Sequence, residues 1–285
     1  MTEEVEFMCS DIKDELKRLW GVELEILGVL DSVCRSEGLR YSLAYGTLLG
    51  AVRHGGFIPW DDDIDIMMPR EDYQKLLSVW EKVAPSRYIL QNKETDRDFT
   101  QNFSKIRKDN TTFIQDSFEY NVNYHTGIFI DIFPGDRAAV GLIDKKTQFA
   151  ACAVNLLFSR EHTSGTGGIT GVVEKALLKL PPGVRNCIRT WMNLYIQKWN
   201  HKTQYEWFFP NTIKDAGRRY PADMFDNMSD ILFEGRRFSC VSDPDVILRT
   251  DFGDYMQLPP IEERTLHHHP IVISFSHNYK KREGK

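Results

Sequence analysis

The chain has 285 residues, 41% of them hydrophobic and 12% aromatic, and its 41 acidic and 36 basic residues give a net charge of −5. This composition predicts a packed globular protein, and the acidic balance argues against a nucleic-acid partner, which would favour a basic surplus. The cysteines form no CxxC pair, and no secretory leader or membrane-spanning run is visible, so we expect a cytoplasmic protein.

The first predicted elements are a helical region, a short strand and a glycine turn. Residues 11–37 place apolar side chains three or four positions apart, which predicts one or two helices that end at Gly38. A strand over 41–45 follows, and Gly46 and Thr47 come directly after it. Backbone N–H groups at such a turn, a hydroxyl and the positive end of the next helix favour phosphate binding. We therefore assign Gly46 and Thr47 to a phosphate cradle.

The run of acids after this turn gives the strongest chemical signal. Asp63 and Asp65 alternate with isoleucines, which predicts a strand over 63–68 with both carboxylates on one face, joined by Asp61 if the extended backbone begins there. Carboxylates this close repel one another unless a cation lies between them, and an oxygen-lined site suits Mg²⁺ or Mn²⁺. We expect Asp61, Asp63 and Asp65 to hold such a metal, and we expect Asp63 and Asp65 to be catalytic residues.

Three other interpretations fit this acidic run less well. A solvated turn suits Asp61 and Asp62 but not aspartates that alternate with isoleucines. An EF-hand calcium loop requires a glycine at the position where Ile66 stands. A glycosidase needs two carboxylates on opposite sides of the scissile bond, and neighbours on one strand face are badly placed for that.

Basic residues accompany the next predicted strands. A helix is predicted over 70–83, and strands are predicted over 88–90, 103–107 and 111–114. Lys105 and Arg107 share one face of the middle strand, which indicates either a solvated edge or the wall of an anion site. A pyrophosphate needs counter-charge beyond one Mg²⁺, so we favour the anion site, with Arg53 as a further source of positive charge.

A single carboxylate interrupts the apolar segment 127–134. The segment predicts a central strand that is buried on both faces, and Asp131 lies within it. A carboxylate there is unfavourable to bury without a partner, which makes Asp131 a candidate third metal ligand or general base. The alternative is that Asp131 caps the turn over 134–136.

The remainder divides into a helical region and a second α/β region. Helices are predicted over 145–160, 172–180 and 184–200, with a glycine-rich loop over 164–171 that lacks a P-loop pattern. Large apolar and basic residues alternate in these helices, so they form either a packed lobe or a contact with a membrane or lipid-linked glycan. A hairpin over 228–241 and a short helix from 243 follow. We divide the chain into a catalytic core (1–140), a helical insertion lobe (141–210) and an α/β segment that completes the core (211–285).

Several of these segments resemble the LicD family of phosphotransferases, which shares its core with fukutin and fukutin-related protein. The closest resemblance lies in 46–54 (GTLLGAVRH) and 56–66 (GFIPWDDDIDI). Further segments agree, namely 127–134 (GIFIDIFP), 220–221, 233–235, 252–256 (FGDYM) and the histidines that follow 258–260. The resemblance spans roughly residues 20 to 270 and weakens between about 140 and 200.

The resemblance implies a fold, a reaction and further site residues. It implies an α+β nucleotidyltransferase-like fold, with a mixed β-sheet core flanked by helices. It implies transfer of a phospho-alcohol, typically phosphocholine from CDP-choline with release of CMP, onto a glycan such as teichoic acid or lipopolysaccharide. In such folds the third acid comes from a neighbouring strand, which supports Asp131. Adjacent histidines alone are a weak zinc signal, but the family carries a pair here, so His267 and His268 are expected to contact substrate or organise the site.

Two alternatives to this reaction stay open. A nucleotidyltransferase would use the same residues but release pyrophosphate. A non-catalytic nucleotide-binding or glycan-binding relative would retain the fold without the chemistry. Aromatic residues that could enclose a choline group include Tyr45, Trp60, Tyr120, Tyr124, Trp207 and Phe208. Because they are so many, they do not by themselves choose choline over ethanolamine, ribitol or glycerol.

Overall fold

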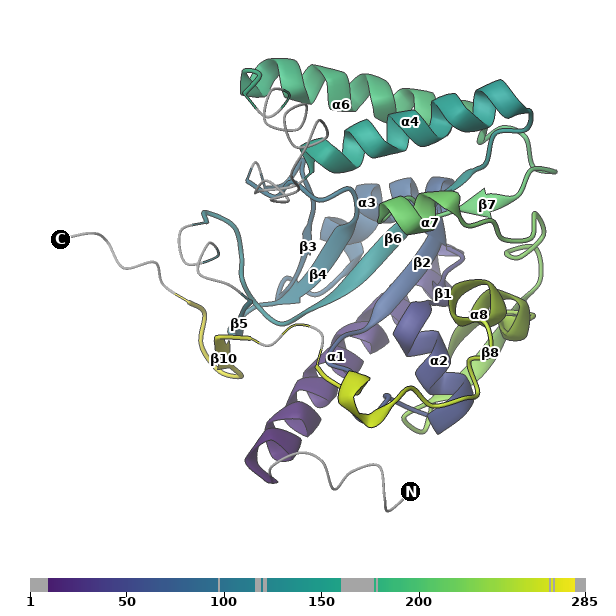
Figure 1. The fold of residues 1–285 in the computed structure, drawn as a ribbon. Coiled ribbons are helices and arrows are strands. Elements are labelled where there is room, and N and C mark those ends of the chain that lie inside the picture. The colour runs from purple at the N-terminus through teal and green to yellow at the C-terminus, as the bar shows by residue number, and fades with distance from the viewer. Residues whose placement is uncertain are drawn as a thin grey trace.

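The protein is built around one mixed β-sheet. The computed structural model describes residues 10–96, 98–115, 119, 122–159, 177, 179–266, 268 and 270–279. Within these ranges a six-stranded sheet has the order β1-β2-β6-β4-β3, and β7 pairs with β6. Helices surround this sheet (Figure 1). The predicted α+β class with a helical lobe is therefore confirmed.

The register of the central strands brings the key charged residues side by side. The strands are β1 (Ser42–Leu43), β2 (Asp65–Pro69), β3 (Tyr88–Gln91), β4 (Ser104–Lys108), β6 (Phe129–Arg137) and β7 (Trp207–Phe208). β2 and β6 are parallel, and their register sets Asp65 opposite Asp131. β4 runs antiparallel on the other side of β6 and sets Lys105 opposite Asp131. All nine residues of β6 are buried, as the apolar segment predicts.

Two helices cover the face of the sheet that does not carry these charges. They are α1 (Ser10–Glu37) and α3 (Arg70–Val83). The Tyr73 hydroxyl on α3 lies 2.6 Å from the Ser104 hydroxyl, and the Lys108 ammonium donates to Glu25 on α1 at 2.6 Å. Ser104 and Lys108 share one face of β4, so both helices pack on it, and Lys105 points to the opposite face. Gly38 ends α1 in the left-handed region (φ 64°), as predicted.

The segment before the acidic run differs from the prediction in its boundaries. The helix α2 spans Tyr45–His54, so Gly46 is the second residue of a helix and not part of a turn that precedes it. β2 begins at Asp65, so Asp63 lies in the extended segment before the strand. The Ile64 carbonyl still accepts a 2.9 Å hydrogen bond from the backbone of Asp131, so the acidic segment is tied to β6 just before β2 starts.

The helical lobe has its own small core. The helices α4 (Leu142–Phe158) and α6 (Pro182–Ile196) lie close together, and a 3₁₀ turn at Gln197–Trp199 follows (Figure 1). They pack with α7 (Ile213–Gly217) around a separate cluster of buried apolar residues. Trp199 is buried, whereas Trp191 is 68% exposed. The predicted loop over 164–171 and most of the predicted helix over 172–180 fall outside the described residues.

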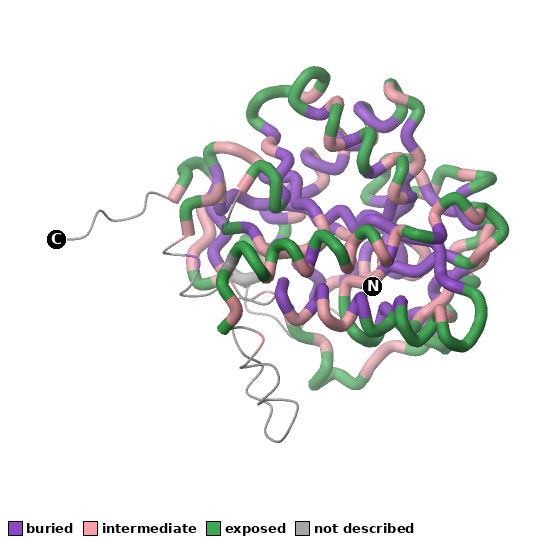
Figure 2. Tube along the Cα trace, turned by 90° about the horizontal axis from the view of Figure 1, so that it is seen from above, coloured by how far each residue is buried: buried purple, intermediate pink, exposed green. Residues whose placement is uncertain are grey.

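The last part of the chain returns to the main core. A hairpin is formed by β8 (Met228–Phe233) and β9 (Arg236–Val241), and its turn residues Glu234 and Gly235 both have positive φ, 48° and 72°. The helix α8 (Pro244–Phe252) follows, then a 3₁₀ turn at Ile261–Glu263, and β10 (Val272–Ser274) pairs with β5 (Thr112–Ile114). Figure 2 shows buried backbone through the middle of the molecule and exposed backbone on the outer helices. Across the described ranges no helix is both long and apolar enough to span a membrane.

Candidate active site

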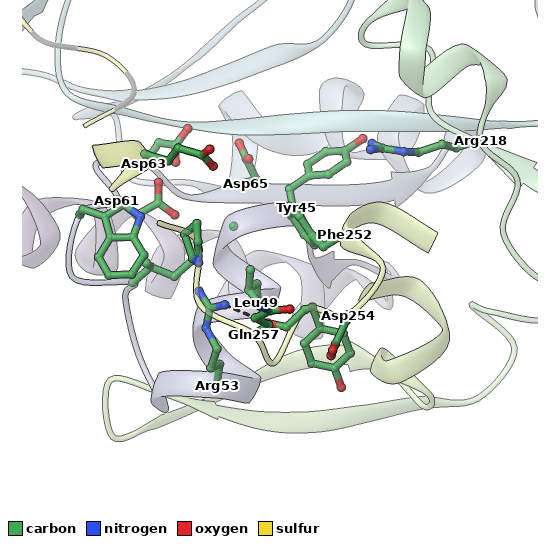
Figure 3. Close-up of a pocket in the computed structure, with 16 residues that line it drawn as sticks. Tyr45, Leu49, Arg53, Asp61, Asp63, Asp65, Arg218, Phe252, Asp254 and Gln257 are labelled. Carbon is green, nitrogen blue, oxygen red and sulfur yellow. Dashed lines mark hydrogen bonds between the residues drawn. The ribbon is translucent and has the colours of Figure 1, made fainter. Parts of the chain in front are cut away.

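A cavity of about 440 Å³ lies beside the acidic segment. It is bounded by the start of α2, the acidic segment and residues from the C-terminal third of the chain. Figure 3 shows Asp61, Asp63 and Asp65 along one side of this pocket, with Arg53 across from them. Its lining is completed by Tyr45, Gly46, Leu49, Ile58, Trp60, Arg218, Phe252, Asp254, Tyr255, Gln257, Pro259 and Glu263.

The acids form a compact oxygen cluster. One carboxylate oxygen from each of Asp61, Asp62 and Asp63 lies within 4.8 Å of the others. A Cβ atom at Gly46 would come within 2.5 Å of an Asp61 oxygen, so only glycine lets that carboxylate approach the first turn of α2. The unpaired N–H groups of a helix start favour a negative charge there. Gly46 thus admits Asp61, a close approach that the phosphate-cradle prediction did not include.

Burial and mutual repulsion make this cluster unfavourable in its ionised form. Burial is the largest cause for each acid, and it raises the pKa of Asp61 to about 6. The pKa of Asp63 rises to about 8 through burial and the charge of Asp61. The pKa of Asp65 is raised well above its ordinary value by burial and by Asp63. A divalent cation would relieve this repulsion, and three close carboxylates are the donors that Mg²⁺ or Mn²⁺ takes. The residues present therefore fit such an ion.

Thr47 supports the strand rather than the cavity. Its hydroxyl oxygen accepts a 2.8 Å hydrogen bond from the backbone N–H of Asp65, and its side chain is buried outside the pocket lining. The hydroxyl therefore fixes the start of β2. We predicted that the Thr47 hydroxyl would contact a phosphate. In the structure it instead binds the backbone N–H of Asp65.

Asp131 has a buried partner, as its environment requires. The Lys105 ammonium donates to both carboxylate oxygens of Asp131, at 2.7 and 3.0 Å. It also lies 3.4 Å from the centre of the Phe129 ring. Burial lowers the pKa of Lys105, while the carboxylate of Asp131 acts in the opposite direction. Lys105 therefore balances the charge of Asp131, beside Asp65 in the sheet.

Arg107 does not reach the pocket. Its guanidinium donates to Gln91 Oε1 at 2.6 Å and to the Gly127 carbonyl at 2.7 Å, and the residue is only 1% exposed. The prediction that Arg107 and Lys105 share one face of the strand is correct. The prediction that Arg107 forms the wall of an anion site is not, because its guanidinium binds Gln91 and Gly127. It links β3, β4 and the start of β6. Arg53, in contrast, lines the pocket and donates to the Tyr255 carbonyl at 2.8 Å.

His268 closes the acidic segment from the far end of the chain. Its backbone N–H donates to Asp62 at 3.0 Å, and its Nδ1 lies 3.2 Å from Asp62 and 3.8 Å from Asp63. Burial lowers the pKa of His268, but Asp62 and Asp63 outweigh that effect and the net shift is upward. The expectation that this histidine organises the site agrees with its contacts. His267 lies outside the described residues.

The sequence analysis did not identify some residues of the site. Arg218 lines the pocket and pairs with Asp215 at 2.5 Å, and nothing near it in the sequence indicates this. Phe252 and Tyr255 also line the pocket, and their presence in a segment shared with a known family was the available signal. Of the candidate cage residues, Tyr45 and Trp60 line the pocket, whereas Trp207 and Phe208 are buried strand residues.

Glu23 on α1 is a second residue that was missed. It is 2% exposed, and its Oε2 has no hydrogen-bond partner among the described residues. Burial raises its pKa well above the ordinary value, and the charge of Asp63 is the next cause. The residue falls four positions after Leu19 and four before Leu27, inside the buried stripe of the helix. A charged residue at such a position was the signal in the sequence.

Comparisons with known proteins identify the family of the chain. A family model described as "LicD/FKTN/FKRP, nucleotidyltransferase domain" matches residues 38–151, which include every aspartate of the cluster and Asp131. The chain is 32% identical to the lipopolysaccharide cholinephosphotransferase LicD of Haemophilus influenzae, over 86% of this chain and 92% of that protein. It is 49% identical over 47 residues to human ribitol 5-phosphate transferase FKRP, of which it covers 9%. The chain belongs to the LicD family of phosphotransferases.

Proposed function

We propose that this protein transfers a phospho-alcohol from a CDP-linked donor to a glycan, with phosphocholine from CDP-choline as the favoured donor group. The observation that carries this proposal is the carboxylate cluster on one side of a pocket whose other side presents Arg53 and aromatic rings. The long match to a lipopolysaccharide cholinephosphotransferase supports lipopolysaccharide or a related cell-surface glycan as the acceptor. Teichoic acid is the other acceptor considered.

Residues that line the pocket, and Asp131 beside them in the sheet, have separate roles in this reaction. Asp61, Asp63 and Asp65 would hold a Mg²⁺ or Mn²⁺ ion, which supplies neutralisation of the donor pyrophosphate when it is bound. Arg53 adds positive charge from the opposite side. The oxygen of an acceptor hydroxyl attacks the phosphorus that carries choline, the bond from that phosphorus to the CMP oxygen breaks, and CMP leaves. The hydroxyl proton goes to a carboxylate base, for which Asp131, oriented by Lys105, is our candidate.

The aromatic part of the pocket supports choline as the alcohol. Tyr45, Trp60, Phe252 and Tyr255 line the cavity together with the acids Asp254 and Glu263. A quaternary ammonium is attracted to the faces of aromatic rings and to nearby carboxylates. Ribitol and glycerol carry no charge, so neither would gain from this combination.

Product analysis tests the proposal directly. Purified protein with Mg²⁺ is given CDP-choline, CDP-ethanolamine, CDP-ribitol or CDP-glycerol, with lipopolysaccharide or teichoic acid as acceptor, and CMP is measured. Metal-dependent CMP from CDP-choline, abolished by EDTA and by Asp65→Ala but not by the exposed control Asp14→Ala, is the expected result. Pyrophosphate release from a nucleoside triphosphate would instead establish a nucleotidyltransferase. Donor binding without any product would identify a non-catalytic relative.

The outer face of the lobe supports contact with a membrane that carries the acceptor. Val184, Trp191 and Leu194 are 45%, 68% and 65% exposed, and with the exposed Cys187 they recur at three-residue and four-residue spacing along α6. The exposed Lys179 and Lys198 lie in the sequence just before and just after this helix. An apolar stripe with basic residues at its ends suits an anionic lipid surface. We propose peripheral binding through this stripe, and Trp199 is not part of it because it is buried.

A further inference from the structure

Helix α1 approaches the acidic segment through two residues one turn apart. The Trp20 indole N–H donates to the Asp61 carbonyl at 2.8 Å, and the indole stacks on Phe57 with ring centres 4.8 Å apart. Glu23 follows three positions later, so it lies on the same side of the helix. Both residues fall before residue 38, outside the part of the chain that the family model matches.

Glu23 is buried without a group that compensates its charge. Its side chain is 2% exposed, and no described residue donates a hydrogen bond to its Oε2. The charges that act on it are those of Asp63, Asp62, Asp61 and Asp65, all of the same sign. An uncompensated carboxyl in such a place destabilises a folded protein, so Glu23 requires a reason that packing does not supply.

The charges around it leave room for a cation. Lys105 pairs with Asp131, and His268 lies beside Asp62 and Asp63. Within the described ranges, Asp61, Asp65 and Glu23 have no Lys, Arg or His side chain at ion-pair distance. Glu23 on α1, Asp61 in the segment before β2 and Asp65 at the first residue of β2 therefore repel one another without a side-chain cation at ion-pair distance.

We infer that Glu23 is a further ligand of the cation site, so that the site reaches beyond the aspartates to helix α1. Glu23, which is not one of the residues that line the pocket, supplies a carboxylate oxygen to the divalent ion, directly or through one bound water. This inference rests on the proposed metal-dependent function. It makes α1 a part of the active site and not only a support for the sheet.

Binding of Mn²⁺ to the whole chain tests this assignment without any measurement of turnover. Isothermal titration calorimetry with Mn²⁺ compares the wild type, Glu23→Gln and Glu25→Gln, and thermal unfolding in EDTA is measured for each. Glu25 is the matched control, because it lies on the same helix but pairs with Lys108 and Tyr88. We expect Glu23→Gln to weaken Mn²⁺ binding by about ten-fold or more and to raise the melting temperature in EDTA, since it removes an uncompensated carboxyl. Glu25→Gln should leave Mn²⁺ affinity unchanged.

Several outcomes would overturn the inference. Equal Mn²⁺ affinity in the wild type and Glu23→Gln would make Glu23 a packing residue. If Glu23→Gln does not fold, Glu23→Asp keeps the charge but withdraws it by one methylene, and unchanged Mn²⁺ affinity in that variant would refute the assignment equally. A wild type that binds no Mn²⁺ refutes both this inference and the metal-dependent function. A wild type that releases CMP with Mg²⁺, beside a Glu23→Gln variant of unchanged affinity, refutes the inference alone.

Discussion

The buried carboxylate of Asp136 and the group of carboxylates around the start of β2 lie along the same pair of strands and differ in how far the protein balances their charge. Asp136, near the end of β6, is 0% exposed, and it receives Arg70 through two hydrogen bonds of 2.9 and 2.6 Å and Asn200 through a third of 2.7 Å. Just before β2, Asp61, Asp62 and Asp63 are close together, and Asp65 follows at the first residue of the strand, with few cations beside them. The first group is balanced by the chain itself. The second has little such counter-charge, and strongly perturbed carboxyl groups of this kind are concentrated at functional sites.

The largest effect is expected where the balanced group is broken. Asp136→Ala leaves the buried Arg70 guanidinium without its partner, and loss of one member of a buried pair costs about 3–5 kcal/mol. Urea unfolding should therefore show a much lower free energy of unfolding, while CMP release per folded molecule stays near that of the wild type. If the variant is as stable as the wild type, the ion pair between Arg70 and Asp136 does not stabilise the fold, and the two ends of the strands do not differ as described.

The opposite pattern is expected at the unbalanced group. Asp65→Ala should lower CMP release by on the order of 10²-fold or more, since it removes charge that acts at the reacting centre. Metal-free stability should not fall, because one repelling carboxylate is lost. The two measurements are CMP release with saturating Mg²⁺ and thermal unfolding in EDTA. Full activity in Asp65→Ala would refute the metal assignment.

The pH dependence of stability distinguishes the two groups further. The pKa of Asp63 is raised from 3.8 to about 8, so the folded, metal-free protein holds this proton more tightly than the unfolded chain does. Its contribution to stability is complete below about pH 4 and is lost as the pH rises towards 8. In EDTA the melting temperature should therefore be lower at pH 8 than at pH 6, and Mg²⁺ should raise it more at pH 8. Asp63→Asn should flatten this dependence, and an unchanged slope in that variant would contradict the assignment.

The smallest effect is expected at the lobe, which joins the balanced end of β6. Replacing Trp191 and Leu194 together by serine should reduce flotation with anionic liposomes several-fold, because two exposed apolar contacts are lost. CMP release with a soluble acceptor should not change. Val83→Ser, an exposed apolar position on α3, serves as the control. Equal flotation of all three proteins would exclude the proposed membrane contact.

Local patterns in the sequence were sufficient to predict much of this architecture. The alternation of Asp63 and Asp65 with isoleucines, and the apolar run around Asp131, predicted two strands, which the structure contains as β2 and β6. The hairpin at Glu234 and Gly235 and the end of α1 at Gly38 followed from turn residues. Each of these features is determined by residues within a few positions of one another, which is the range over which periodicity and turn chemistry operate.

The parts that escaped prediction depend on partners distant in the chain. Arg107 was assigned to phosphate from its strand face, but Gln91 and Gly127 accept its hydrogen bonds. Thr47 was assigned to phosphate from its place after a glycine, but the backbone of Asp65 holds its hydroxyl. A local pattern predicts the direction in which a side chain points but not the group that it contacts. The roles of Arg107 and Thr47 therefore depended on tertiary contacts.

The contact between Asp62 and His268 has a consequence for the synthesis of the protein. The two residues are 206 positions apart, and the strand that follows His268, β10, is held by pairing with β5. Asp62 is synthesised 206 residues before His268, so the acidic segment stays without this histidine while the intervening residues are made. Contacts between such distant segments form slowly. The arrangement in which His268 covers the acidic segment therefore forms only after the chain between these two residues has been made.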